Sequence, residues 1–133
     1  MPRPRAAIAA VADGDAVVVA SPVYRASIPG ILKNLLDLVP VTGLEAKPVG
    51  IVAMGGSAHH YLGVDRHLRD ILSWFGALVA PTGVYLTGAD FDAGIPTASA
   101  VATLGDLAAT VLALTDRLSG AVLGPEPLAK RAW

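Results

Sequence analysis

The sequence predicts an α/β domain built on a parallel sheet, because buried-strand patterns alternate with amphipathic helix patterns along its 133 residues. Residues 16–20 carry three consecutive valines, an apolar run typical of a strand that is covered on both faces. Apolar residues at helical spacing follow over residues 28–39, and Pro40 ends that helix. Residues 48–54 then form a second buried strand, which completes a strand–helix–strand unit.

The rest of the chain continues this alternation. The further elements expected are the end of an Ala-rich helix at 5–12, a helix at 64–75, a strand within 78–86 with Pro81 at its start, and a long helix at 101–118. We expect one domain over residues 1–123 and a flexible tail over residues 124–133, which opens with the sequence Gly-Pro-Glu-Pro.

The composition excludes several classes of function. The chain has no cysteine, so it forms no disulfide, thiolate metal site or thiol redox centre, and any redox role needs a bound cofactor. A formal net charge of −1 with no basic stripe gives no basis for binding nucleic acid. No apolar run reaches the ~20 residues that cross a bilayer. Asp13 and Asp15 also interrupt the apolar N-terminal stretch, so we expect a cytoplasmic protein without a membrane partner.

The first predicted strand leads directly into a turn that could bind a ligand. Residues 21–27 read Ser-Pro-Val-Tyr-Arg-Ala-Ser, and the next helix begins at once. In an open parallel sheet, ligands bind just beyond the carboxyl ends of the strands. Pro22 fixes the direction of the turn and Tyr24 presents an aromatic ring, so this turn could hold a flat ring system. Ser27 is expected to cap the helix that follows.

Two blocks of the sequence resemble the NADPH-dependent FMN reductase family, which has a flavodoxin-like fold. The first block joins the turn at 21–27 to the helix start Gly-Ile-Leu-Lys-Asn-Leu-Leu-Asp at 30–37. The second runs from Gly-Leu-Glu-Ala-Lys-Pro-Val at 43–49 into Ala-Met-Gly-Gly-Ser-Ala-His-His at 53–60. The resemblance extends over roughly residues 7–90, and it implies a flavodoxin-like three-layer sandwich with a parallel sheet.

The resemblance also implies a set of cofactor-binding residues: Pro22, Val23, Tyr24, Arg25, Gly55, Gly56, Ser57 and His60. In this interpretation Tyr24 packs on the flavin ring and Arg25 meets the cofactor phosphate. The Gly-Gly-Ser loop adopts unusual φ values and points its amides at the polar edge of the flavin. His60 either donates a hydrogen bond to the flavin or nicotinamide or caps the next helix. No catalytic acid or base is expected, because the flavin carries the chemistry, and no metal site is expected either.

The chain departs from the family before its first strand. The strand at 16–20 corresponds to the third strand of the family, so strands equivalent to 3-4-5 are retained and the domain is N-terminally incomplete. In the family a loop rich in Gly, Ser and Thr wraps the FMN phosphate at a helix N-terminus, and no such loop can be assigned here. Two explanations remain. The chain is a shortened gene product whose start is placed too late, or it is a short relative that covers the bare edge of the 16–20 strand by oligomerisation.

The resemblance implies NAD(P)H-dependent reduction of FMN by hydride transfer, with FMN and NADPH (or NADH) as cofactors and with reduced flavin passed to a monooxygenase. It also implies a homo-oligomer, with the helices around Ile31 and Leu68 as the candidate homodimer interface. Two alternatives stay open: a non-catalytic remnant or interaction module that no longer retains cofactor, and a flavin-dependent quinone or azo reductase. Arg66 and Arg69, one turn apart on a helix, are expected on a solvated face or at a subunit interface.

Overall fold

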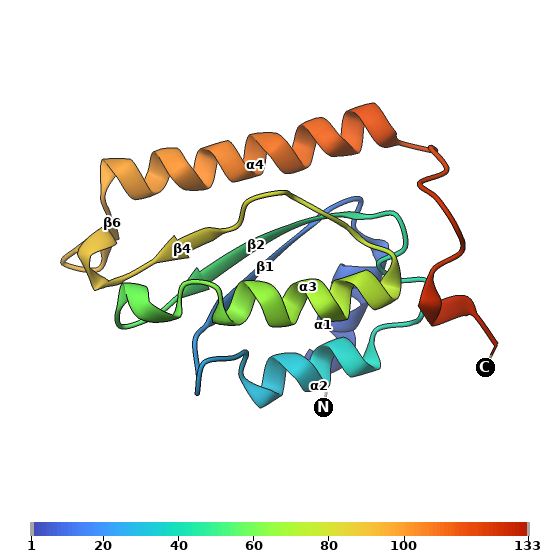
Figure 1. Ribbon diagram of the computed structural model, residues 1–133, viewed down its shortest axis with the longest axis horizontal. Helices are drawn as coiled ribbons and strands as arrows, with labels where there is room; N and C mark the ends of the chain where they lie inside the picture. The colour runs from blue at the N-terminus through green and yellow to red at the C-terminus, as the bar shows by residue number, and fades with distance from the viewer. Residues whose placement is uncertain (1, 133) are drawn as a thin grey trace.

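The computed structural model describes residues 2–132 and shows a three-layer α/β sandwich (Figure 1). Its central sheet holds β1 (Val17–Pro22), β2 (Pro48–Met54), β3 (Leu78–Val79) and β4 (Val84–Leu86), all paired in parallel. Helix α4 (Ala98–Leu118) lies on one side of the sheet, and α1 (Pro2–Asp13), α2 (Gly30–Leu38) and α3 (Gly63–Phe75) lie on the other. The predicted alternation of strands and helices is therefore confirmed.

Short elements complete the chain: the 3-10 helices η1 (Ala58–His60), η2 (Gly88–Asp90) and η3 (Leu128–Lys130), and the hairpin strands β5 (Phe91–Asp92) and β6 (Ile95–Pro96). The hairpin stands apart from the main sheet, between β4 and α4.

Strand β2 lies at the centre of the sheet and divides the core in two. Its alternate residues Val49, Ile51 and Ala53 are at most 2% exposed and pack in one cluster with residues of α2 and α3. Val52 belongs to the opposite face and packs in a second cluster with Leu107 and Val111 of α4. This burial on both sides is what the continuous apolar run of β2 predicted.

Strand β1 is longer than the sequence predicted. Its register with β2 reaches Pro22 opposite Met54, so Ser21 and Pro22 belong to the strand and not to the turn. A proline is tolerated here because β1 is an edge strand. The next amide, that of Val23, donates to the Met54 carbonyl, so the nitrogen of Pro22 is directed at the open edge, where no donor is needed.

The prediction that β1 is covered on both faces is wrong. Val19 packs against the core that α2 and α3 cover, but Val18 is 50% exposed and Ala20 is exposed as well. Ala20 pairs with Val52, which packs against α4, so the open face of β1 is the α4 side. Helix α4 packs on β2 and β4 there, and the exposure of Val18 and Ala20 shows that it leaves this face of β1 open. Among the described residues β1 pairs with β2 alone, which confirms the predicted bare edge.

The third predicted strand is interrupted. Strand β3 pairs with the first residues of β2, and β4 pairs with the last residues of β2. The Ala80 amide still donates to the Val49 carbonyl at 2.8 Å, and residues 81–83, Pro-Thr-Gly, leave the ladder. Pro81 therefore marks the interruption instead of the strand start, because a residue without an N–H cannot continue a ladder in the middle of a sheet.

Helix α4 leaves much of its apolar surface uncovered. Ala100, Leu107 and Val111 are buried, whereas Val101 and Leu112 are 56% and 62% exposed. By length and composition alone this helix is apolar enough to cross a bilayer, which corrects the expectation that no run of the chain reaches that length. One such helix is weak evidence for a membrane span, and here it packs along a sheet.

The segment after α4 returns to the α3 side of the molecule (Figure 1). Pro127 packs against Gly76 at the end of α3, and the ammonium of Lys130 forms an ion pair with the Glu45 carboxylate at 3.2 Å. The flexibility expected of residues 124–133 stays a prediction.

Candidate functional site

The two loops that the sequence singled out start side by side. The Val23 amide donates to the Met54 carbonyl at 2.8 Å, so the turn after β1 is hydrogen-bonded to the last residue of β2. Gly55 follows Met54 and lies so close to the Val23 side chain that a Cβ there would contact it at 3.4 Å. Both loops therefore leave the carboxyl ends of neighbouring parallel strands, where ligands bind in open α/β sheets.

The turn after β1 has a strained backbone. Tyr24 and Ser27 exchange two backbone hydrogen bonds, of 2.9 and 3.0 Å, which close a two-residue turn. Its central residues Arg25 and Ala26 have φ values of 52° and 60°, in the left-handed region that costs a residue with a Cβ roughly 1–2 kcal/mol. The Tyr24 side chain is 61% exposed, as expected for a ring presented to a ligand.

Ser27 does not cap α2, so that prediction is wrong. The helix starts at Gly30 after Pro29, whose position has no side-chain cap, because Ser27 is used to close the tight turn. The Ser27 hydroxyl instead lies 2.6 Å from Nδ1 of His67, a residue of α3. This contact ties the turn after β1 to α3.

The Gly-Gly-Ser loop differs from expectation in its backbone. Neither Gly55 nor Gly56 has a positive φ, and the left-handed residues lie in the other loop. The Gly55 amide is already used, since it donates to the Leu86 carbonyl at 3.0 Å. Within the described part of the chain the amides of Gly56 and Ser57 have no acceptor, so they are the two donors that this loop offers.

Tyr85 holds this loop in place, a role that the sequence did not reveal. Its hydroxyl donates to the Ser57 carbonyl, and its ring closes the space beside Gly55, where a Cβ would collide with it. Gly56, in contrast, has open space around its Cα, because no atom of the described residues lies within 4 Å of the point where a Cβ would stand. Gly55 is thus needed for packing, and Gly56 leaves room for a ligand.

His60 lies in η1 and does not cap a helix. The position before α3 is Leu62, which has no side-chain cap, and η1 is preceded by Ser57. His60 is exposed and lines a surface hollow of about 430 Å³ that also includes Ala26 and Arg66. The capping role expected as one alternative for His60 is therefore wrong, and the ligand contact stays a prediction.

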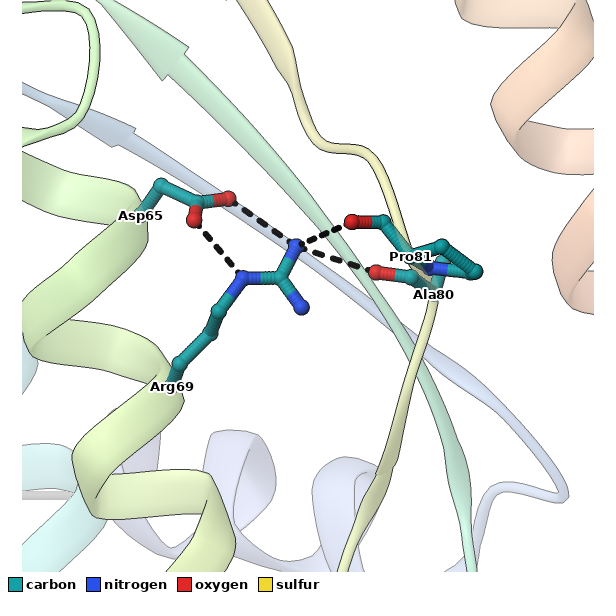
Figure 2. Close-up of polar contacts among 4 residues, drawn as sticks. All are labelled: Asp65, Arg69, Ala80 and Pro81. Atoms are coloured by element: carbon teal, nitrogen blue, oxygen red, sulfur yellow. Dashed lines mark hydrogen bonds and ion pairs between the residues drawn. The ribbon is translucent and has the colours of Figure 1, made fainter.

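Arg69 has a structural role (Figure 2). Its guanidinium binds both oxygens of Asp65, at 2.7 and 3.2 Å, and donates to the carbonyls of Ala80 and Pro81 at 3.0 and 3.2 Å. The Arg69 side chain therefore satisfies the carbonyls that the interruption between β3 and β4 frees from the ladder. The i,i+4 spacing of Asp65 and Arg69 is the sequence signal for the ion pair, but the carbonyl partners were not predictable.

Comparisons with known proteins identify the family of this chain. Residues 2–92 match the family model described as NADPH-dependent FMN reductase. The chain is 46% identical over 86 residues to the NADH-dependent FMN reductase SfnF of Pseudomonas fluorescens, which covers 65% of this chain and 46% of that protein. It is 46% identical over 82 residues to the FMN reductase (NADPH) of Pseudomonas aeruginosa, covering 62% and 44%. The chain thus spans about half the length of the curated relatives it matches.

Solved structures share the fold. The apo form of the NADH:FMN oxidoreductase EMOB superposes with a TM-score of 0.71 at 27% identity, over 89% of this chain and 61% of that one. An oxidoreductase from Corynebacterium diphtheriae superposes with a TM-score of 0.69 at 31% identity, over 87% and 62%. The fold is therefore flavodoxin-like, and with most of its length matched by the family model this chain belongs to the NADPH-dependent FMN reductase family.

Proposed function

We propose that this chain builds one wall of an FMN site and takes part in NAD(P)H-dependent reduction of FMN. In the balanced reaction a hydride from NAD(P)H and one proton convert FMN to FMNH₂ and leave NAD(P)⁺. The observation that carries the proposal is the junction of the two loops at Val23 and Met54, which joins Tyr24 and Gly56 into one surface at the carboxyl end of the sheet.

The residues of this surface fit a flat heterocycle with polar edges. The amides of Gly56 and Ser57 are donors for ring oxygen and nitrogen atoms, and the space at Gly56 permits close approach of a ligand. Tyr24 offers an exposed ring that can pack against another aromatic system. When bound, FMN supplies the redox chemistry, and the protein supplies binding and orientation.

Arg25 and His60 have supporting roles in this proposal. Arg25 is exposed at the turn, where its guanidinium can meet an anionic group of the cofactor. His60 can donate a hydrogen bond to flavin or nicotinamide from η1. Pro22 and Val23 set the path of the turn, through the fixed φ of the proline and the Val23 hydrogen bond to β2.

We further propose that the domain is N-terminally incomplete with respect to the family and that residues outside this chain bind the FMN phosphate. The edge of β1 is unpaired within the described residues, and Val18 beside it is half exposed. Val101 and Leu112 of α4 add exposed apolar surface on the same side of the sheet. A further strand and helix would cover both surfaces and bring a phosphate-binding loop to the site.

The assembly and setting of the protein form part of the proposal. A homodimer through α2 and α3 is supported by the exposed residues Ile31, Leu38 and Trp74 on these helices. Trp74 also lines a hollow of about 450 Å³ between the two helices. Leu68 itself is fully buried and belongs to the core. We expect a cytoplasmic protein that passes reduced flavin to a monooxygenase, with no nucleic-acid or membrane partner.

A coupled assay tests the activity. We expect purified protein to oxidise NADPH or NADH in proportion to added FMN, followed by the loss of nicotinamide absorbance. A rate that depends on a quinone while FMN is present only in catalytic amounts would instead assign a quinone reductase. Flavin binding without nicotinamide oxidation would contradict the catalytic part of the proposal. Loss of both flavin binding and nicotinamide oxidation would favour the interaction module that no longer retains cofactor.

A further inference from the structure

A surface hollow beside the proposed flavin wall has the side chains of an anion site. It has a volume of about 430 Å³, which is within the range of roughly 300–1,000 Å³ typical of small-molecule pockets. Ala26 from the turn after β1 and His60 from the loop after β2 both line it, so it is continuous with the two loops. Its floor comes from the start of α3, including Arg66 and His67.

Arg66 is the cation of this hollow, and its charge is not neutralised by the fold. Over residues 2–132 its guanidinium forms no hydrogen bond or ion pair, and the side chain is exposed. Arg69, three residues later, is the contrasting case, because Asp65 and two carbonyls use its donors. A free guanidinium in a concave surface favours a phosphate, which it can bind with two parallel hydrogen bonds.

Three histidines, His59, His60 and His67, line the hollow together with Arg66, and two of them contact a hydroxyl group. Nδ1 of His67 lies 2.6 Å from the Ser27 hydroxyl, and Nδ1 of His59 lies 3.1 Å from the Ser57 hydroxyl. Where the serine hydroxyl donates to Nδ1, the imidazole carries its N–H at Nε2, and this second nitrogen can donate a hydrogen bond to an anion. Asp70 is the opposing feature, a carboxylate that also lines the hollow.

We infer that this hollow binds a phosphate group of the nicotinamide dinucleotide, with Arg66 as its principal ligand. The inference rests on the proposed function, because the hollow is lined by Ala26 and His60, which come from the two loops of the proposed flavin wall. Two phosphates share this chemistry, the pyrophosphate of both dinucleotides and the ribose 2′-phosphate of NADPH alone. Arg66 distinguishes NADPH from NADH only where the group that it binds is the ribose 2′-phosphate.

Calorimetric titration of the full chain with NADPH, NADH, 2′,5′-ADP and ADP tests this inference. We expect Arg66→Gln to weaken binding by about tenfold or more, as loss of a charge-assisted pair does, and Arg66→Lys to restore part of it. Asp70→Asn should tighten binding. Arg117→Gln removes an exposed arginine at the end of α4 and should change nothing.

The pattern across ligands assigns the phosphate. Loss confined to NADPH and 2′,5′-ADP assigns the ribose 2′-phosphate. Equal loss for NADPH, NADH and ADP, with a smaller loss for 2′,5′-ADP, which contains no pyrophosphate, assigns the pyrophosphate. If the Arg66→Gln and Arg117→Gln variants bind the four ligands with equal affinity, the inference is overturned. It is also overturned if the wild-type protein binds none of the four. Titration with lumiflavin, which has no phosphate, reports on the flavin wall separately, so failure of one proposal is distinguishable from failure of the other.

Discussion

The Met54 carbonyl accepts a hydrogen bond from the Val23 amide at 2.8 Å, and this bond makes one surface of two loops that are about thirty residues apart in the sequence. The pairing of β1 with β2 continues up to this point, because Pro22 is the register partner of Met54. The site is therefore built by strand register, and its two loops are fixed relative to one another by the sheet.

Gly56→Ala tests whether a ligand approaches the loop closely. The added Cβ meets no atom of the described residues, so we expect an unchanged free energy of unfolding. Flavin affinity should fall by about tenfold, the effect of roughly 1.4 kcal/mol of steric conflict. Gly105→Ala on α4 is the control, since it also has open space and lies outside the site. Equal flavin affinity in the two variants would show that the flavin does not contact Gly56.

Ala26→Gly tests the strain in the turn after β1. Glycine removes the cost of a left-handed φ but adds flexibility to the unfolded chain, so we expect a net stabilisation of roughly 0.5–1 kcal/mol. The same substitution at Ala109, in the interior of α4, should destabilise the protein by about 1 kcal/mol. Urea unfolding measures the free energy of unfolding of both variants. A destabilised Ala26→Gly variant would contradict the claim that the left-handed φ of Ala26 costs stability.

Arg69→Ala should cost much more stability than the loss of an exposed ion pair. Its removal leaves the largely buried Asp65 carboxylate and two carbonyls without their donor, which costs about 2–3 kcal/mol. Lys33→Ala breaks an ion pair of the same spacing with Asp37, but both groups are about half exposed and the cost should be below about 1 kcal/mol. Similar losses for the two variants would remove the structural role assigned to Arg69.

Lys47 gives a pH-dependent contribution to stability. Burial lowers the pKa of its ammonium below the ordinary 10.5, against the opposing effect of Asp13 and Asp15, and the group donates to the carbonyls of Val11 and Ala12 at 2.6 and 2.8 Å. Between the lowered pKa and 10.5 the unfolded chain binds more protons than the folded one. The contribution of Lys47 to the free energy of unfolding therefore increases as the pH rises from the lowered pKa to 10.5.

The matched variant for this effect is Lys47→Met. The free energy of unfolding of this variant should lack the contribution that Lys47 adds at alkaline pH. The wild type should therefore become more stable relative to the variant as the pH approaches 10.5. The lost hydrogen bonds to the end of α1 add an offset that does not depend on pH. A difference that stays constant over the whole window would contradict the lowered pKa.

The sequence predicted most of the elements because their signals are local. The apolar run of β2, the apolar spacing of α3 and the proline after α2 each act within a few residues. Pro81 is a local signal for the interruption between β3 and β4, but no local pattern shows that Arg69 reaches across from α3 to the carbonyls of Ala80 and Pro81. The open face of β1 was also missed, because a valine run does not reveal whether a helix covers it.

The candidate site, too, was predicted only in part from the sequence. Motif resemblance identified Tyr24 and the glycine loop, and strand order placed them together. The resemblance could not show that Arg25 and Ala26 would take the left-handed φ values while the glycines would not. It also gave no sign that Tyr85 would support Ser57, since that contact joins residues 28 positions apart.

Nuclear magnetic resonance of the ¹⁵N-labelled chain during titration with lumiflavin tests the central claim most directly, because lumiflavin presents the flavin ring without the phosphate. The account predicts that the amide signals of Tyr24, Arg25, Gly56 and Ser57 shift together with one affinity. Shifts confined to other parts of the protein, or none at all, would contradict the claim that these two loops form a wall for the flavin ring.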